Sequence, residues 1–197
     1  MTTNDLRISE TGKKKPRLLL HICCGPCALF PVAELLAQGV EVVGLFYNPN
    51  IHPLAEYLRR REAAVQAAAR LGIKIIFKDD EYDPSTYLRR VVFREENRCF
   101  HCYHLRLERT MSVARRGKFD YFSTTLLYSK FQKHEEIAGL ARDLAGGGDL
   151  RFWYQDFRSG WKQGIERSRE WSLYRQQYCG CIYSEFERFG RDLASQS

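Results

Sequence analysis

The chain has 197 residues, of which 44% are hydrophobic, and 31 Lys and Arg against 24 Asp and Glu give a formal charge of +7. A chain of this length can bury its own core, which excludes a small scaffold held together by disulfides. Its first residues lack the apolar segment of a signal peptide, and no run approaches the length of a membrane span. We therefore expect a cytoplasmic protein with reduced thiols and no membrane partner.

The composition predicts one folded domain without repeats or low-complexity tracts. We expect a flexible basic tail over residues 1–16, a single α/β metal-binding catalytic domain over residues 17–190, and a C-terminal tail over residues 191–197.

Hydrophobic patterning predicts alternating strands and helices. In chain order we expect a strand over 17–22, a helix over 28–38, a strand over 41–47, a helix over 53–71, a strand over 73–77, helical segments over 87–93 and 100–116, a strand over 119–123, a helix over 129–145, a strand over 150–154, and mostly helical sequence afterwards. The capping-box spacing of Ser129 and Gln132 sets the start of the helix over 129–145. Strands separated by helices predict a parallel sheet with helices on both faces.

Seven cysteines dominate the chemistry and fall into three groups: Cys23, Cys24 and Cys27; Cys99 and Cys102; Cys179 and Cys181. In a reducing compartment, clustered cysteines hold a metal or cycle as a redox pair.

The first group lies where the first strand turns into the first helix, at the carboxyl edge where open α/β sheets bind ligands. Cys24-Gly-Pro-Cys27 is identical to the thioredoxin active-site sequence, so a thioredoxin-like thiol-disulfide oxidoreductase is one alternative. Against it, another cysteine precedes the motif, α/β units continue for another hundred residues, and five cysteines are left without a role.

The Cys99-x-x-Cys102 spacing at a helix start suits zinc or an iron–sulfur cluster, and an adjacent cysteine pair elsewhere would complete four thiolates. A zinc-stabilised RNA-binding protein is therefore a second alternative, although structural zinc usually takes two Cys-x-x-Cys units. A disulfide within Cys179-Gly-Cys181 would be strained and easily reduced, which suits a redox-cycling pair. Ligation of a second metal is the other interpretation of this pair.

Aromatic and basic residues alternate from Phe152 to Tyr178. Phosphate neutralisation together with stacking on exposed rings is how proteins bind unpaired RNA. The alternative is that the rings are core and the charges are only solvated. The RNA-binding candidates are Arg158, Trp161, Lys162, Tyr174 and Arg175.

Five segments in order resemble the cobalamin-independent epoxyqueuosine reductase family, over Arg17 to about Ser184. They are LLLHICCGPCA, FYNPNIHPLAEYLRR, NRCFHCYHLRLERT, FSTTLLYSKFQKHEEI and YQDFRSGWKQGIERSREWSLYRQQYCGCIYS. The resemblance implies a Rossmann-like parallel sheet with helices on both faces, related to the nucleotide α-hydrolase and PP-loop (HUP) fold, with a mostly helical C-terminal part. It implies an oxidoreductase that reduces epoxyqueuosine at the wobble position of tRNA to queuosine, the last step of queuosine biosynthesis.

The resemblance also implies site residues. Cys23, Cys24, Cys99 and Cys102 would bind a [4Fe–4S] cluster, and Cys179 and Cys181 would form the redox-active pair, without cobalamin and with an electron donor that the sequence does not identify. An additional iron on Cys27, Cys179, Cys181 and Asp156 stays open beside this assignment.

Two further sets of residues are expected from the same reaction. The epoxide oxygen needs a proton or a metal to leave, and Asp156 and His21 are candidate proton donors; a helix cap and a core histidine are the alternatives for them. Candidates for the anticodon arm are Arg106, Arg158, Trp161, Lys162, Tyr174 and Arg175, and Tyr128, Lys130 and His134 are expected near the same cleft.

Overall fold

Five short parallel strands form one sheet in the computed structural model, which describes residues 14–194 and the side chains of residues 14–190. The strand order is β3-β2-β1-β4-β5, and every neighbouring pair is parallel. The strands are β1 (Arg17–His21), β2 (Glu41–Phe46), β3 (Lys74–Phe77), β4 (Tyr121–Thr124) and β5 (Arg151–Phe152). The predicted parallel α/β sheet is thereby confirmed.

Strand β1 lies at the centre of the sheet because its sequence is apolar throughout. Leu18, Leu19 and Leu20 are fully buried between the layers, as expected for a strand that has helices on both faces.

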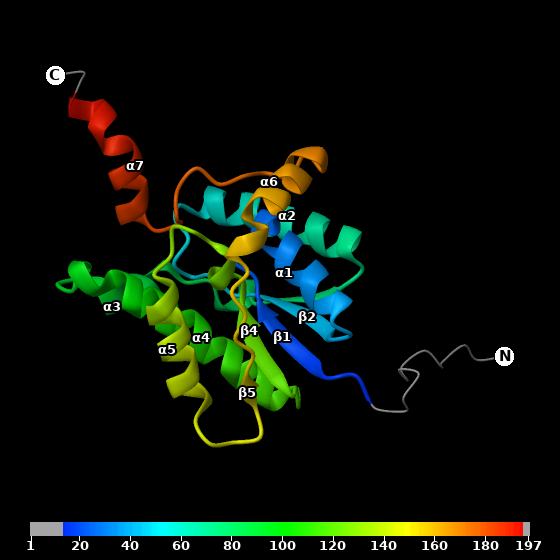
Figure 1. Cartoon of the computed structure of the whole chain (residues 1–197). Coiled ribbons are helices and arrows are strands. Elements are labelled where there is room, and N and C mark those ends of the chain that lie inside the picture. The colour runs from blue at the N-terminus through cyan, green and yellow to red at the C-terminus, as the bar shows by residue number, and fades with distance from the viewer. Residues whose placement is uncertain (1–13, 195–197) are drawn as a thin grey trace.

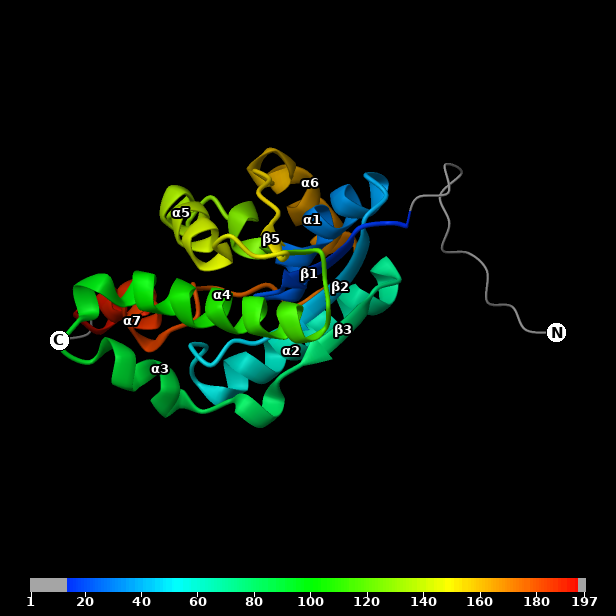
Figure 2. The same ribbon diagram turned by 90° about the horizontal axis from the view of Figure 1, so that it is seen from below.

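The helices cover both faces of the sheet. From β1 the sheet extends through β2 to β3 on one side and through β4 to β5 on the other. Because connections between parallel strands are right-handed, α1 and α2 lie on one face of the sheet, and α4 and α5 lie on the opposite face. Helix α6 packs against α1, and α4 lies between α3 and α5 (Figures 1 and 2). The helices are α1 (Gly25–Ala37), α2 (Leu54–Leu71), α3 (Pro84–Val91), α4 (Arg98–Arg116), α5 (His134–Ala145), α6 (Trp161–Glu170) and α7 (Ile182–Ala194).

Helix α7 projects away from the sheet (Figure 1). Because α7 continues to Ala194, residue 190 is not a helix end, and the boundary of the C-terminal tail stays a prediction. The predicted basic tail lies almost entirely outside the described residues.

The direction of the sheet order reverses between β1 and β4. In open α/β sheets the crevice beyond the carboxyl ends of the strands at such a switch point is where ligands bind. The sequence places Cys23 and Cys24 directly after β1, and Thr125 directly after β4.

Two predicted helix starts differ from the structure. Helix α1 begins at Gly25 rather than residue 28, because Cys24 caps it and Pro26 is accepted in the first turn. The predicted start of α5 at Ser129 is wrong. The Ser129 hydroxyl accepts a hydrogen bond from the Phe131 N–H in a local turn, and α5 begins at His134.

Gly25 allows α1 and α2 to approach closely beside the first cysteine group. A Cβ atom at Gly25 would lie 2.3 Å from the Ala63 carbonyl oxygen of α2. That contact is with backbone, so relief would require one helix to move.

We expect Gly25→Ala to lower the free energy of unfolding by about 1–3 kcal/mol because it overpacks this helix contact. Gly139, inside α5, has open space around it, so Gly139→Ala should instead raise stability by about 0.5–1 kcal/mol. Urea unfolding of both variants tests the pair. Equal effects of the two substitutions would contradict the close approach at Gly25.

Candidate functional site

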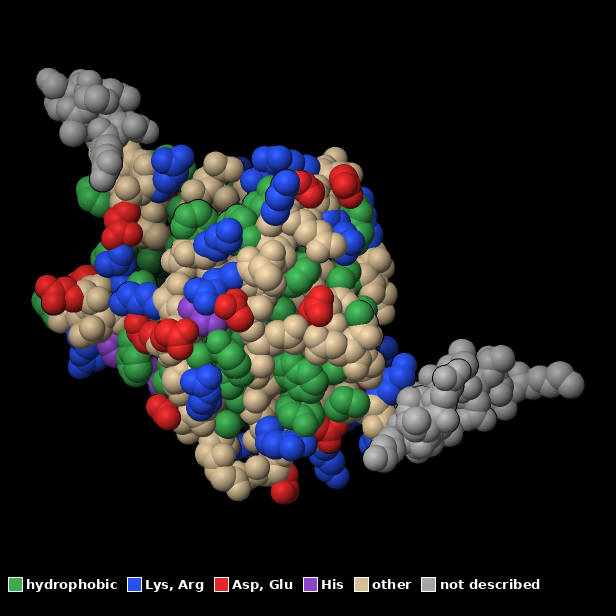
Figure 3. Space-filling view, in the orientation of Figure 1, with side chains coloured by type: hydrophobic (Ala, Val, Ile, Leu, Met, Phe, Trp, Pro, Cys, Tyr) green, Lys and Arg blue, Asp and Glu red, His purple; other side chains and the backbone are tan. Residues whose placement is uncertain are grey.

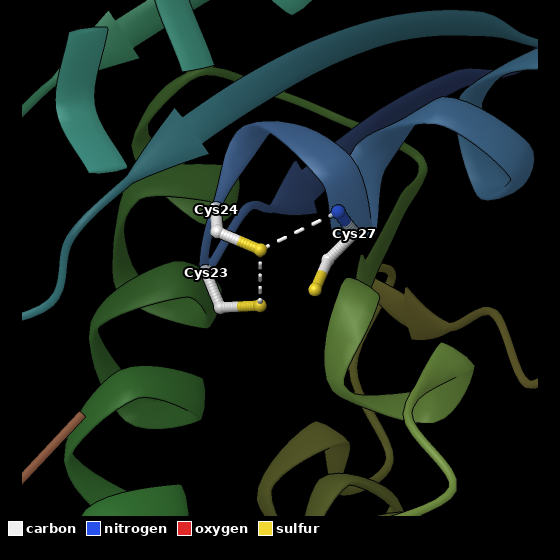
Figure 4. Close-up of side chains that lie close together, drawn as sticks. All are labelled: Cys23, Cys24 and Cys27. Carbon is white, nitrogen blue, oxygen red and sulfur yellow. Dashed lines mark hydrogen bonds between the residues drawn. The ribbon is translucent and has the colours of Figure 1, made fainter. Parts of the chain in front are cut away.

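The first thiol cluster consists of Cys23, Cys24 and Cys27, whose sulfur atoms all lie within 4.8 Å of one another (Figure 4). Cys24 is the N-cap of α1, and its Sγ accepts a hydrogen bond from the Cys27 N–H at 3.4 Å. The Sγ atoms of Cys23 and Cys24 are 3.9 Å apart. Sulfurs around one tetrahedral ion are separated by about 3.8 Å, from metal–sulfur bonds of about 2.3 Å. The spacing therefore suits a metal ligand set.

Thr125, from the end of β4, fixes Cys23 through two hydrogen bonds. Its hydroxyl accepts from the Cys23 N–H at 3.1 Å and donates to the Cys23 Sγ at 3.4 Å. Hydrogen bonds from the thiols of Cys24 and Cys27 lower the pKa of Cys23, whereas burial raises the pKa of Cys24 and the hydrogen bond to Cys23 raises that of Cys27. The cluster thus holds one thiolate readily, and further thiolates need a cation.

The second thiol cluster consists of Cys99, Cys102, Cys179 and Cys181, which line one cavity of about 180 Å³. Cys99 and Cys102 lie in the first two turns of α4, and Cys179 and Cys181 come from the segment between α6 and α7. Burial raises the pKa of Cys102 to about 12.

The two clusters divide the cysteines differently from the implied ligand set, which takes two sulfurs from each. Cys27, which the sequence analysis considered only for an additional iron, packs beside Cys23 and Cys24. The assignment of Cys23, Cys24, Cys99 and Cys102 to one metal centre stays a prediction.

Arg106, one turn after Cys102 in α4, brings a positive charge to the thiols. Its side chain is only 3% exposed, and it donates through Nη2 to the Cys102 Sγ at 2.9 Å and through Nε to the Cys102 carbonyl oxygen at 3.1 Å. Among residues 14–190 it has no carboxylate partner. A buried cation requires a counter-charge, and the thiols are the groups available to provide one. The expectation that Arg106 binds RNA is wrong because the guanidinium is buried.

A buried ion pair in α2 holds the segment that carries Cys179 and Cys181. Arg60, 2% exposed, pairs with Glu56 at 2.6 Å. The same guanidinium donates to the carbonyl oxygens of Cys179 at 2.7 Å and Tyr178 at 2.9 Å. The planar fork of an arginine suits such convergent contacts.

The backbone at Gly180 completes this attachment. Its carbonyl oxygen accepts a hydrogen bond from the His52 N–H at 2.7 Å. Its φ of +144° strains any residue with a side chain, and a Cβ there would lie 3.1 Å from the Arg60 Nη1. The glycine between the two cysteines is therefore required for the close approach to Arg60.

Cys179 and Cys181 differ in accessibility. Cys179 is exposed, and its Sγ accepts a hydrogen bond from the Gln132 amide at 3.2 Å. Cys181 is buried beside the Ser184 hydroxyl at 3.5 Å. One accessible and one sheltered thiol is an arrangement that lets the first react while the second resolves it.

The two candidate proton donors lie in contrasting surroundings. The Arg158 guanidinium, at 2.6 Å, lowers the pKa of Asp156 to about 2, so this carboxylate is charged at neutral pH, and it is not part of the wall of the thiol cavity. His21 is buried with its ring nitrogens near the Thr124 hydroxyl and the Asn48 side chain. Burial, followed by the charge of Arg106, lowers the pKa of His21 to about 4, so it is neutral. These contacts favour the alternative roles, a local cap for Asp156 and a core histidine for His21.

The expected RNA-binding residues are only partly available on the surface. Lys162 and Arg175 are exposed, whereas Arg158 is occupied by Asp156. The Tyr174 hydroxyl donates to Glu56 at 2.5 Å, and Trp161 packs on Tyr128 with ring centroids 5.1 Å apart.

The structure also places the residues expected near the same cleft. Lys130 is exposed. Tyr128 and His134 are buried and do not line the thiol cavity, and their place near a cleft stays a prediction.

Three residues at the thiol cavity were not identified from the sequence. Asn50 and Tyr87 line it and are fully buried, and the Asn50 Oδ1 and the Tyr87 hydroxyl have no hydrogen-bond partner among the described residues. Phe131 lies at the cavity wall although it is largely exposed. A single apolar residue inside a polar loop was the only sequence signal for Phe131.

These features define an α/β protein whose seven thiols gather in two clusters around the carboxyl edge of a parallel sheet. The family described as epoxyqueuosine reductase QueH matches residues 18–187. The chain belongs to this family of oxidoreductases.

Several relatives carry the same description. The epoxyqueuosine reductase QueH of Dehalococcoides mccartyi is 38% identical over 176 residues, covering 89% of this chain and 96% of its own. The Haemophilus influenzae protein of that name is 36% identical, covering 85% and 71%, and the Thermotoga maritima protein is 32% identical, covering 87% and 91%. The thioredoxin-like and zinc-module alternatives are not favoured by these matches.

Among solved structures, the U34-tRNA thiolase NcsA from Methanococcus maripaludis with its [4Fe-4S] cluster aligns with 96% of this chain and 69% of its own. The identity is 15% and the TM-score 0.48. The relation to the nucleotide α-hydrolase fold stays a prediction at this level of similarity.

None of the helices within residues 14–194 is long and apolar enough to cross a bilayer.

We expect Arg60→Ala to lower the free energy of unfolding by about 3–5 kcal/mol, because it leaves Glu56 buried without its partner. Cys181 should then react faster with iodoacetamide, because the segment loses its attachment to α2. Arg61→Ala is the matched control: Arg61 pairs with Asp79 on a half-exposed face, so its loss should cost about 1 kcal/mol or less. Unchanged Cys181 reactivity in Arg60→Ala would contradict the role of Arg60 in holding the segment.

Proposed function

We propose that the chain reduces the epoxide of epoxyqueuosine in tRNA to the alkene of queuosine. The observation that carries the proposal is the QueH family match over residues 18–187, together with the seven thiols at the edge of the sheet. A zinc-stabilised RNA-binding protein would not need the accessible and sheltered pair of Cys179 and Cys181.

The reaction balances with a dithiol as the immediate reductant. Conversion of the epoxide to an alkene takes up two electrons and two protons and releases one water. Oxidation of Cys179 and Cys181 to a disulfide supplies both electrons and both protons. The disulfide is then reduced by an electron donor that neither the sequence nor the fold identifies, and Cys179 is the more accessible sulfur for that step.

The donor set fits an iron–sulfur centre. We assign Cys23, Cys24, Cys99 and Cys102 as ligands of a [4Fe–4S] cluster, and the Cys27 sulfur lies within 4.8 Å of those of Cys23 and Cys24. When bound, such a cluster relays electrons singly. Arg106 offsets the charge that several thiolates would bring to this buried site.

An additional iron on Cys27, Cys179, Cys181 and Asp156 is less well supported. Both carboxylate oxygens of Asp156 contact Arg158. Asp156 would have to leave this partner before it could bind a metal.

Within the cavity, Tyr87 and Asn50 are the polar groups we propose for orienting the oxygen-bearing ring. Burial raises the pKa of Tyr87, so its hydroxyl stays protonated and can donate a hydrogen bond. The Asn50 amide provides both donors and an acceptor. The Tyr87 hydroxyl and the Asn50 Oδ1 lack hydrogen-bond partners in the described chain, so substrate oxygens would meet groups with free hydrogen-bonding capacity.

We expect Cys24→Ser and Cys102→Ser to lose most bound iron in anaerobic preparations, because three thiolates hold a four-iron cluster poorly. Cys27→Ser is the matched comparison, since Cys27 is in the same thiol cluster but outside the proposed ligand set. Iron and sulfide analysis with absorbance near 400 nm provides the measurement. Full iron content in Cys24→Ser together with iron loss in Cys27→Ser would replace Cys24 by Cys27 in the ligand set.

We expect Cys179→Ser and Cys181→Ser to keep their iron yet lose turnover, because each removes half of the two-electron store. Thiol titration should show one redox-active pair fewer than in the unmodified protein. Loss of about one metal per chain in Cys179→Ser would instead make these residues metal ligands.

A further inference from the structure

Phe131 is 83% exposed and lies at the wall of the thiol cavity. Burial of a phenylalanine is favourable by about 1.5–3 kcal/mol, so an exposed ring at a cavity is a surface available to a ligand. Phe93 is even more exposed, at 94%, but it is not part of this cavity. The position of Phe131, rather than its exposure alone, distinguishes it.

Contacts with Ser129 and Trp161 hold the Phe131 ring in place. The Phe131 N–H donates to the Ser129 hydroxyl at 3.2 Å, and the ring meets Trp161 edge to face, with centroids 5.6 Å apart at 78°. Trp161 in turn rests on Tyr128, whose hydroxyl donates to the Trp161 carbonyl oxygen at 3.1 Å. Gly164 of α6 permits this contact, since a Cβ there would lie 2.1 Å from the Tyr128 hydroxyl oxygen.

Cationic side chains flank the exposed ring. Lys130 and Lys133 are its neighbours in the loop, and both are exposed. Lys133 also lines the thiol cavity and is paired with Glu136 at 3.4 Å. On the face drawn in Figure 3, Lys and Arg side chains lie over α6, the helix that begins with Trp161, with Asp and Glu side chains between them.

The residue that follows Phe131 contacts the redox thiol. Gln132, the next residue, donates to the Cys179 Sγ at 3.2 Å. A group stacked on Phe131 would therefore lie beside the opening that leads to Cys179.

The volume of the cavity indicates what enters it and what stays outside. At about 180 Å³ the cavity is smaller than the 300–1,000 Å³ of pockets that enclose a drug-sized ligand. A modified nucleobase together with its substituent is too large for it. The base would remain at the mouth, where a flat apolar surface with nearby cations is the surface that unpaired nucleobases bind.

We propose that the exposed face of Phe131 stacks on the modified nucleobase of the tRNA substrate, taken out of the anticodon stack, and positions its substituent in the thiol cavity. This inference rests on the proposed function. Trp161 and Tyr128 support the stacking ring, while Lys130 and Lys133 contact neighbouring phosphates.

The test measures base stacking directly on the iron-loaded, full-length protein. The probe is an anticodon stem-loop RNA with 2-aminopurine at the wobble position, whose fluorescence falls when the base stacks on an aromatic ring. Phe131→Ala should weaken binding about 5- to 150-fold, as loss of one base–aromatic stack does, and should remove the quenching. Phe131→Tyr should retain both, because it keeps the ring.

Phe93→Ala is the matched control for loss of an exposed ring, and we expect it to bind as the unmodified protein does. Iron content and urea unfolding of Phe131→Ala should be unchanged. Equal affinity and quenching in Phe131→Ala and Phe93→Ala, with RNA binding intact, would overturn the stacking role alone. A protein that neither binds RNA nor reduces an epoxide-bearing tRNA would overturn the proposed function itself.

Discussion

The arrangement of the thiols depends on one buried ion pair, Arg60 with Glu56 in α2. Burying a cation and an anion costs free energy because both lose their hydration. The cost is offset here by the ion pair itself and because the guanidinium also binds the carbonyl oxygens of Tyr178 and Cys179. The pair thereby joins α2 to the segment between α6 and α7. Without this attachment, Cys179 and Cys181 would not be held beside Cys99 and Cys102.

A second buried cation, Arg106, acts on the thiols themselves. It donates to the Cys102 sulfur without a carboxylate partner in the described chain, and its charge also contributes to the lowered pKa of His21 beside the first thiol cluster. A low-dielectric site that gathers several thiolates needs such a positive charge. Arg60 thus fixes where Cys179 and Cys181 lie, and Arg106 offsets negative charge on the thiols.

The fold was predictable because its signals are local. Apolar runs and helical spacing gave five parallel strands in the expected order along the chain, and glycines marked the ends of α2 and α5. The start of α5 was not predictable from its capping-box spacing, because the Ser129 hydroxyl hydrogen-bonds to the Phe131 N–H in a turn of its own. A serine at this position can cap a helix or close a short turn, and the sequence pattern does not distinguish the two.

The sequence alone determined the parallel α/β class, the grouping of the cysteines and the family resemblance, since each depends on residues that are neighbours in the chain. Tertiary structure decided that the second and third cysteine groups meet at one cavity, that Arg106 is buried, and that Phe131 lies at that cavity. The contact of Arg60 with Cys179 spans 119 positions. Such contacts depend on how helices pack across the sheet, and no pattern within a short window of sequence specifies that packing.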